Sequence, residues 1–232
     1  MALWKMASIL VTALFFVAAR RLNRKWPSLL FSPAIIAPVG IMALLLATDT
    51  PFSAYQEGTD LLNEMLGPVT VAFAIPLYRH WPILVSHWRM IVGSLAAGSL
   101  IAISAGVSTT LLLGLGREAA ISVIPRSITL PVAVGLSESI GGIPSMTALF
   151  VMLTSFAGVF WAPAIIRRMR LSHPVSIGLM YGMGGHVLGM ARAMERGDLE
   201  GSSATLAVVA GAVMTVAWAF LLLPVILLWM GV

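Results

Sequence analysis

The sequence predicts an all-α, polytopic membrane protein, and its composition carries most of that prediction. Hydrophobic residues make up 59% of the 232 residues and charged residues only 10%, whereas an ordinary soluble domain carries roughly 25% charged residues. The mean hydropathy is +0.98. These values exclude an ordinary soluble domain, and we expect residues 1–232 to form a single transmembrane domain.

Apolar runs follow one another along the whole chain with little else between them. Each is near the ~20 residues that a helix needs to cross a bilayer, which predicts about seven to eight hydrophobic segments. The runs lie at 3–19, 28–47, 61–78, 90–114, 118–138, 143–166, 174–194 and 203–230. Arg20 and Arg21 follow the first run without a good small-residue cleavage site, so we interpret it as a membrane helix rather than a signal peptide.

The net charge of +5 comes from short basic clusters between the runs, at residues 20–25, 79–89 and 167–170. This pattern indicates topology rather than nucleic-acid binding, and the three loops are expected to face the cytoplasm. If all eight runs crossed, the cluster at 167–170 would lie outside. One segment must therefore not cross fully, and 118–138 is the best candidate, although another dipping segment would serve equally. The N-terminus is then outside and the C-terminus inside.

The run at 118–138 is interrupted by Pro125 and Pro131, with Arg126, Ser127 and Thr129 between them. In hydrocarbon, a broken segment that carries a charge is tolerated only where protein buries it or where it lines a watery cavity. Such Pro-broken or re-entrant helices form solute sites in transporters.

The break therefore predicts a site for a small organic anion. Arg126 would supply charge, while Ser127, Thr129 and the free amides of a half-helix beginning after Pro125 would donate hydrogen bonds to a carboxylate. The alternative is that Arg126 reaches toward an interface and the prolines are only kinks.

A similar but weaker pattern lies at 61–78, where Pro68 and Pro76 follow an acidic residue within an apolar stretch. Paired interrupted segments are typical of inverted-repeat transporters, so an inverted-repeat architecture is one possible outcome. Pro68, Thr70 and Pro76 are accordingly candidate substrate contacts.

The run at 174–194 contains small residues at spacings of three and four, which would form one stripe along a continuous helix and permit close packing. The stripe consists of Gly178, Gly182, Gly185, Gly189 and Ala193. Its simplest interpretation is a helix-packing seam, which would also favour a homo-oligomer such as a dimer.

His186 is the only histidine inside an apolar run, and we place it beside Gly182 and Gly189 on the stripe face. His186, Gly185 and Gly189 are candidate substrate contacts, and His186 is also a candidate proton-coupling group. A structural hydrogen bond to a neighbouring helix is the alternative. Arg192 is a further candidate, but Glu195 lies three residues on and can pair with it.

Other classes of function find little support. The chain has no cysteine, and we find neither a metalloprotease HExxH motif nor a GxSxG nucleophile motif. We therefore expect no enzyme activity, no metal and no cofactor.

Five stretches resemble the LrgB/CidB family, which includes YohK-like bacterial proteins and part of the plastid glycolate/glycerate translocator. They lie in the family's order and span most of the chain. The stretches are LNEMLGPVTVAFAIPLY (62–78), PRSITLPVAV (125–134), IGGIPSMTA (140–148), GHVLGMARAMERG (185–197) and EGSSATLA (200–207).

This resemblance implies export, uptake or exchange of small monocarboxylates such as glycolate, glycerate, pyruvate or lactate. It equally implies the alternative of an antiholin-like regulator of murein hydrolases acting with a small LrgA/CidA-type membrane partner. Three positions depart from the family pattern: Gly185 replaces a usual serine, Met190 a usual threonine, and Arg126 a frequent lysine. Arginine keeps the charge but adds a planar fork that can hold a carboxylate with two hydrogen bonds.

Overall fold

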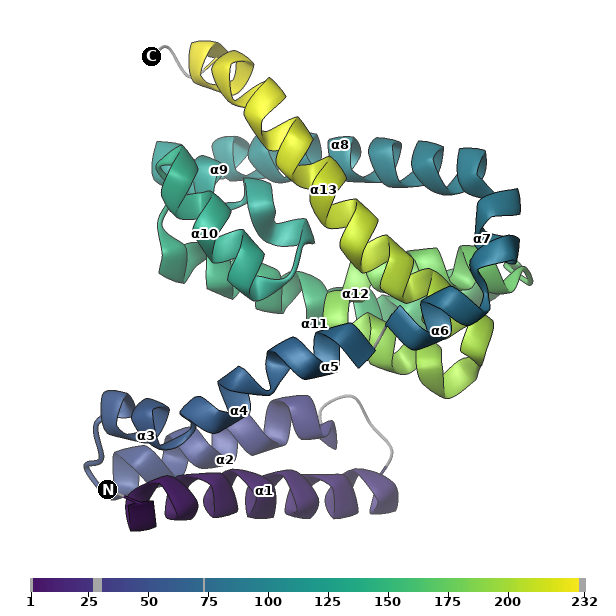
Figure 1. Ribbon diagram of the computed structural model, residues 1–232. Helices are drawn as coiled ribbons and strands as arrows, with labels where there is room; N and C mark the ends of the chain where they lie inside the picture. The colour runs from purple at the N-terminus through teal and green to yellow at the C-terminus, as the bar shows by residue number, and fades with distance from the viewer. Residues whose placement is uncertain (1, 27–30, 73, 230–232) are drawn as a thin grey trace. The chain divides into compact units, whose positions relative to one another are not determined.

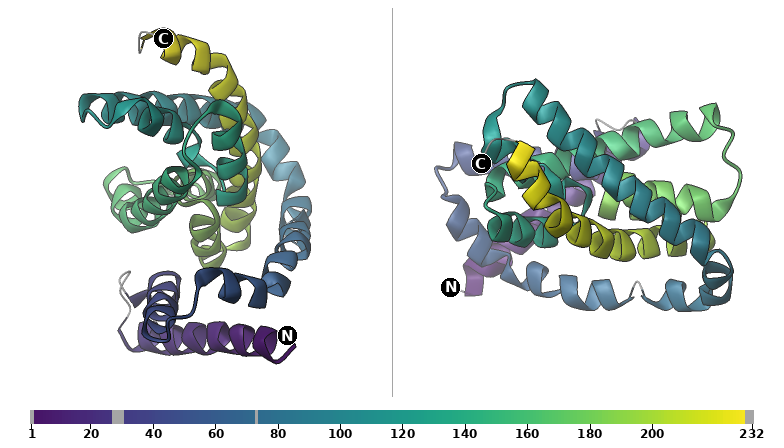
Figure 2. Two further views of the ribbon diagram at one scale, coloured as in Figure 1. Left: turned by 90° about the vertical axis from the view of Figure 1, so that its left-hand side faces the viewer. Right: turned by 90° about the horizontal axis from the view of Figure 1, so that it is seen from above.

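Helices are the only regular secondary structure in the residues that the computed structural model describes, which are 2–26, 31–72 and 74–229. The chain divides into two units, residues 1–72 and 73–232 (Figures 1 and 2). The predicted all-α class is thus confirmed for the described part of the chain.

The first unit consists of two longer helices and three short ones. These are α1 (Ala2–Lys25), α2 (Pro33–Ala47), α3 (Phe52–Gly58), α4 (Asp60–Glu64) and α5 (Leu66–Ala72). Two long-range hydrogen bonds hold α3 on α1. The Trp4 indole donates to the Ala54 carbonyl at 2.8 Å, and the Thr12 and Tyr55 hydroxyls lie 2.7 Å apart.

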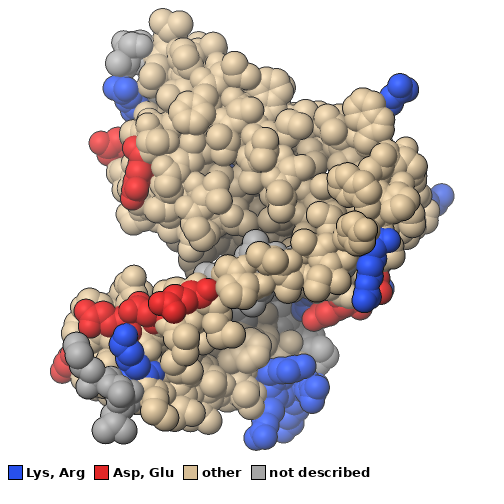
Figure 3. Space-filling view, viewed as in Figure 1, with Lys and Arg blue, Asp and Glu red and all other residues tan. Residues whose placement is uncertain are grey.

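The second unit contains the predicted break. Its elements are α6 (Ala74–Arg79), α7 (Trp81–Ser86), α8 (Trp88–Leu112), α9 (Gly116–Ser122), the 3₁₀ turn η2 (Ile124–Ser127), α10 (Leu130–Ile140), α11 (Pro144–Arg168), α12 (Pro174–Arg196) and α13 (Asp198–Trp229). On the face seen in Figure 3, charged side chains lie at the margins of this unit and its middle is uncharged.

Four helices are long and apolar enough to cross a membrane, counted over the described residues: α1, α8, α11 and α13. This supports a helical membrane protein, whereas seven to eight crossing segments are not confirmed. The run at 61–78 is divided among α4, α5 and α6, and the run at 28–47 yields the 15-residue α2.

The start of α8 and the end of α11 lie at the same end of the second unit. His87, just before α8, packs against His173, in the loop between α11 and α12, with tilted rings whose centroids are 5.1 Å apart. The predicted basic segments 79–89 and 167–170 therefore share one end, which we call the basic end. Because α8 leaves this end and α11 returns to it, residues 113–143 begin and end at the opposite end of the unit.

The segment 116–140 folds back on itself between α8 and α11. Ser122, at the end of α9, accepts a hydrogen bond from the Ile143 amide, and its carbonyl accepts one from Thr147 near the start of α11. Thr147 also donates to the Ser137 hydroxyl on α10 at 2.7 Å. Buried hydroxyls thus fasten both arms of this segment, which we call the first hairpin, to α11.

Apolar side chains bury the first hairpin against α8 and α13. The cluster includes Ile103 and Val107 from α8, Ile124 and Ile128 from the turn, and Ala219 from α13. The non-helical backbone of the turn is consequently enclosed by protein, as a break at membrane depth requires.

A second folded segment, which the sequence analysis did not predict, lies within α12. His186 has φ 47° and ψ −128°, which separates residues 174–185 from 187–196. A Cβ placed on Gly189 would collide with the carbonyl of Tyr181. Residues eight apart in a straight helix are separated by about 12 Å along its axis. The chain therefore reverses at His186, and we call residues 174–196 the second hairpin.

The small-residue stripe predicted along one helix is therefore wrong. Gly178 and Gly182 pack against the carbonyls of Glu200 and Ala204 on α13. Gly185 faces α11 instead, and Gly189 faces the first half of its own hairpin. The glycines do allow close approach, but against three different surfaces.

The second hairpin also corrects the predicted position of the C-terminus. Because residues 174–196 leave and re-enter at the basic end, α13 starts there and crosses away from it. Trp229 accordingly lines a surface hollow with Leu111, Gly114 and Gly116, beyond the end of α8. The end of α13 lies opposite the basic end, so the expectation that the C-terminus shares the side of the basic loops is wrong.

Candidate functional site

The tips of the two hairpins meet. The ring of His186 donates a hydrogen bond from Nε2 to the backbone carbonyl of Arg126, at 3.2 Å. These residues are 60 positions apart in the chain, and His186 is only 3% exposed. A break in one helix is thereby joined to a break in another.

The Arg126 side chain lies between α8 and α11 at mid-length of both. It donates from one terminal nitrogen to Thr154 Oγ1 at 3.2 Å and from the other to the Ala102 carbonyl at 3.1 Å. Ala102 is two residues past the middle of α8, and Thr154 two before the middle of α11. This position does not fit the alternative that Arg126 reaches toward an interface.

The guanidinium has neutral partners only. The one ion pair found among the described residues joins Arg192 and Glu195, so no carboxylate of that part of the chain neutralises Arg126. An uncompensated charge in a half-buried place is costly, and arginine's planar fork of donors suits a carboxylate. The arrangement can therefore accept a small anion.

The predicted half-helix at this site begins later than expected. Pro125 starts the short turn η2, Ile128 and Thr129 are extended, and α10 starts at Leu130 with Thr129 as its N-cap. The Thr129 side chain makes no capping hydrogen bond. The first amides of a helix have no partner within it and carry partial positive charge, so the start of α10 adds donors at the tip.

The other residues of the first tip differ in exposure. Pro125 and Ser127 are buried, and Thr129 is half-buried. Pro131 is exposed and occupies the first turn of α10, where its missing N–H costs no hydrogen bond. Its place at the start of α10 indicates a role in shaping the backbone.

The second tip owes its shape to glycine. Gly184 and Gly185 precede His186, and a Cβ on Gly158 of α11 would collide with the Gly184 carbonyl. Gly185 is buried, and a Cβ there would lie 2.8 Å from Val159. The tip thus lies directly on the backbone of α11, one turn beyond Thr154.

Several predicted site residues are not brought to these tips. Arg192 lies six residues beyond His186, is exposed, and pairs with Glu195 at 2.9 Å, as the alternative interpretation expected. Gly189 contacts Tyr181. Pro68 is exposed in the first unit, while the side chains of Thr70 and Pro76 fall outside the described residues.

Three contact residues were missed by the sequence analysis: Ala102, Thr154 and Gly158. Ala102 acts through its carbonyl and Gly158 through its lack of a side chain, so neither residue type indicates a site. Thr154 is a polar residue in the middle of an apolar run, and this position was the one available signal.

Comparison with known proteins agrees with the motifs. The model of the LrgB-like family matches residues 12–225. The uncharacterized protein YwbG of Bacillus subtilis (strain 168) is 36% identical over 211 residues, covering 90% of this chain and 92% of its own. The uncharacterized protein YxaC of the same organism is 33% identical over 206 residues, covering 89% and 90%. No solved structure matches. The chain therefore belongs to the LrgB-like family.

Proposed function

We propose that the protein transports small monocarboxylates across the bacterial inner membrane, with the carboxylate bound at Arg126. The observation that carries the proposal is a guanidinium at mid-length of two long apolar helices, joined only to neutral oxygens. Glycolate, glycerate, pyruvate and lactate are the substrates that the family resemblance favours.

Binding would exchange partners at the guanidinium. Thr154 and the Ala102 carbonyl satisfy one N–H on each terminal nitrogen. A carboxylate in the plane of the fork would form charge-assisted hydrogen bonds, which are roughly twice as strong as neutral ones. The amides at the start of α10 can donate to the same anion.

The two hairpins also support an inverted-repeat architecture. The segments that correspond to each other are then 116–140 and 174–196, whereas the sequence suggested 61–78 and 118–138. α8 and α11 each have 25 residues, run in opposite directions, and each is followed by a hairpin. Ala102 and Gly158 are both the fifteenth residue of their helix, and each contacts the tip of the hairpin that follows. Movement of one half against the other would expose the joined tips to each side alternately.

Counterflow of radiolabelled acids in proteoliposomes tests this function. Arg126→Ala should lose saturable flux by at least 10-fold, because the charge that compensates the carboxylate is gone. Arg126→Lys should retain part of it, since the charge remains without the fork. Arg192→Ala removes an exposed arginine from the same unit and should transport normally, provided that all variants elute as folded protein.

Wild-type flux in Arg126→Ala would contradict the assignment of the site. Absence of flux for every acid, alone or with a small LrgA/CidA-type membrane partner, would contradict transport itself. The antiholin-like regulatory role would then be the better interpretation of family membership.

A further inference from the structure

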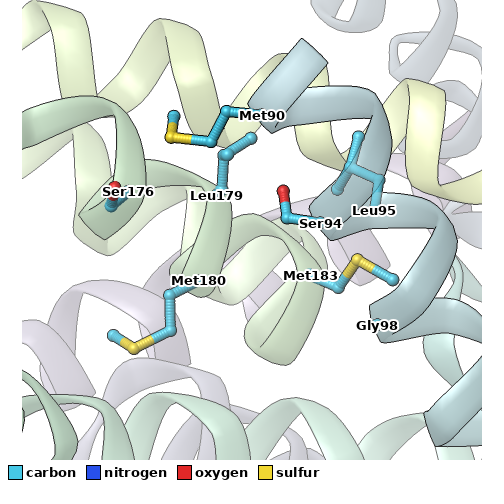
Figure 4. A pocket seen from close by; sticks show the side chains of 8 residues that line it. All are labelled: Met90, Ser94, Leu95, Gly98, Ser176, Leu179, Met180 and Met183. Atoms are coloured by element: carbon cyan, nitrogen blue, oxygen red, sulfur yellow. The ribbon is translucent and has the colours of Figure 1, made fainter. Parts of the chain in front are cut away.

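A cavity of about 250 Å³ lies between α8 and the first half of α12 (Figure 4). Met90, Ser94 and Gly98 line it from α8, and Ser176, Met180 and Met183 from α12. Met90 is the third residue of α8 and Ser176 the third of α12. The cavity therefore starts at the basic end.

The α8 face that lines the cavity continues to Arg126. Ser94, Gly98, Ala102 and Gly106 follow one another at intervals of four residues, so each lies one turn from the one before it and together they form a row that winds gradually around the helix. Ser94 and Gly98 line the cavity, the Ala102 carbonyl accepts from Arg126, and a Cβ on Gly106 would lie 2.9 Å from the Arg126 Nε. One helical turn, about 6 Å, separates the cavity from the guanidinium contact.

On the α12 side, the same continuity leads to the second tip. Ser176, Met180 and Met183 are spaced as neighbours on one helix face, and His186 follows three residues after Met183. The cavity thus lies beside two helices that both lead to the joined tips.

Met183 lies where the cavity and the tips would connect. Its Sδ is 3.6 Å from a Cβ placed on Gly98 of α8 and 3.7 Å from one placed on Gly211 of α13. The Met183 side chain thus fills the space between Gly98 of α8 and Gly211 of α13. Figure 4 shows it beside Gly98. Methionine is unbranched and flexible, so it can leave such a position without moving backbone.

We infer that this cavity is the water-filled entrance through which a small organic anion reaches Arg126 from the basic end, and that Met183 is its gate. The inference rests on the proposed function for the identity of the solute, but not for the existence of the path. Arginines of the basic end, such as Arg89 beside Met90, would concentrate anions at its mouth.

Thiol labelling tests the entrance directly, since the chain has no cysteine of its own. Ser94→Cys and Ser176→Cys in proteoliposomes should react with a charged, membrane-impermeant methanethiosulfonate added at the basic end. Val92→Cys is the matched control, because Val92 is exposed but lies half a turn from Ser94 on α8 and does not line the cavity. It should react only with an uncharged, permeant maleimide.

The gate is tested at the next turn of α8. Ala102→Cys should resist the charged reagent while Met183 is present and react at least 10-fold faster when combined with Met183→Ala. Met180→Ala shortens another cavity methionine that touches neither glycine, and it should leave Ala102→Cys protected. Met183→Leu, which preserves bulk, should protect as the wild type does.

The outcomes separate the two proposals. If Ser94→Cys and Ser176→Cys behave like Val92→Cys, the cavity holds lipid and the entrance is refuted, whether or not the protein transports. If labelling succeeds but Met183→Ala does not expose Ala102→Cys, the gate is refuted. If the charged reagent labels both cysteines but no acid shows counterflow, the entrance is supported and monocarboxylate transport is refuted.

Discussion

His186 adopts a backbone conformation that residues with a side chain rarely use, with φ 47° and ψ −128°. Such a conformation costs of order 1–3 kcal/mol, whereas one hydrogen bond contributes about 1 kcal/mol net. The contact with the Arg126 carbonyl therefore does no more than offset the backbone cost. The histidine is explained better by the joining of two tips than by stability.

Replacement of His186 can separate the cost of its backbone conformation from the contribution of its hydrogen bond. His186→Gly and His186→Ala both lose the hydrogen bond, but only glycine relieves the backbone. The glycine variant should be more stable than the alanine variant by about 1 kcal/mol. Thermal unfolding of the purified variants in detergent measures the difference, and an alanine variant as stable as the glycine variant would contradict a strained tip.

The two tips differ in how visible they are in the sequence. Pro125 and Pro131 bracket a charged residue, so the first break could be predicted with its main residues. The second break has no proline, and glycines at spacings of three and four fit a continuous helix equally well. Gly184 and Gly185 directly before His186 were the available signal, since each weakens a helix by about 1 kcal/mol relative to alanine.

Among the helices, α11 is the element that positions both hairpins. Thr147 holds the arms of the first hairpin, Thr154 contacts its tip, and Gly158 carries the second tip. All three lie within the first 15 residues of one 25-residue helix. Length and hydropathy predicted this helix, but they could not predict which of its faces would receive the two tips.

Gly158→Ala should therefore be strongly destabilising. Its methyl group would meet the backbone of Gly184, which cannot move aside as a flexible side chain can. Overpacking of this kind costs typically 1–3 kcal/mol, and the second tip should be displaced. Thermal unfolding and tryptic cleavage near residues 184–196 are suitable measurements.

Gly135→Ala on α10 is the matched control for that change. Nothing lies within 4 Å of a Cβ at this position, so the better helix propensity of alanine should keep or raise stability. Equal stability of the two alanine variants would show that α11 and the second tip are not in backbone contact.

For the whole second unit, two hairpins that each return to their starting end leave α8, α11 and α13 as its helices that are long and apolar enough to cross a membrane. This arrangement fixes the relative sides of its loops. The basic segments 79–89 and 167–170 share a side, as their charges predicted, whereas the end of α13 lies on the other side. The prediction failed for the C-terminus because it counted α12 as a crossing.

Reporter fusions can check this path in cells. Alkaline phosphatase joined after the last residue should be active, because the charge bias predicts cytoplasmic basic loops and the C-terminus would then be periplasmic. The same reporter joined after Arg170 should be inactive, and a green fluorescent protein there should fluoresce. Opposite results at the C-terminal fusion alone would mean that α12 crosses the membrane.

The contact between Arg126 and its partners also constrains the order of biogenesis. When synthesis of the first hairpin ends at Ile140, Ala102 has already been made, but Thr154 and His186 have not. At that point Arg126 has only one of its side-chain partners and its helix is interrupted. Both features make entry of the segment into lipid unfavourable. The first hairpin should therefore reach its final depth only after His186, 46 residues beyond Ile140, has been synthesised, and we expect its insertion to be a late step that depends on the C-terminal half of the chain.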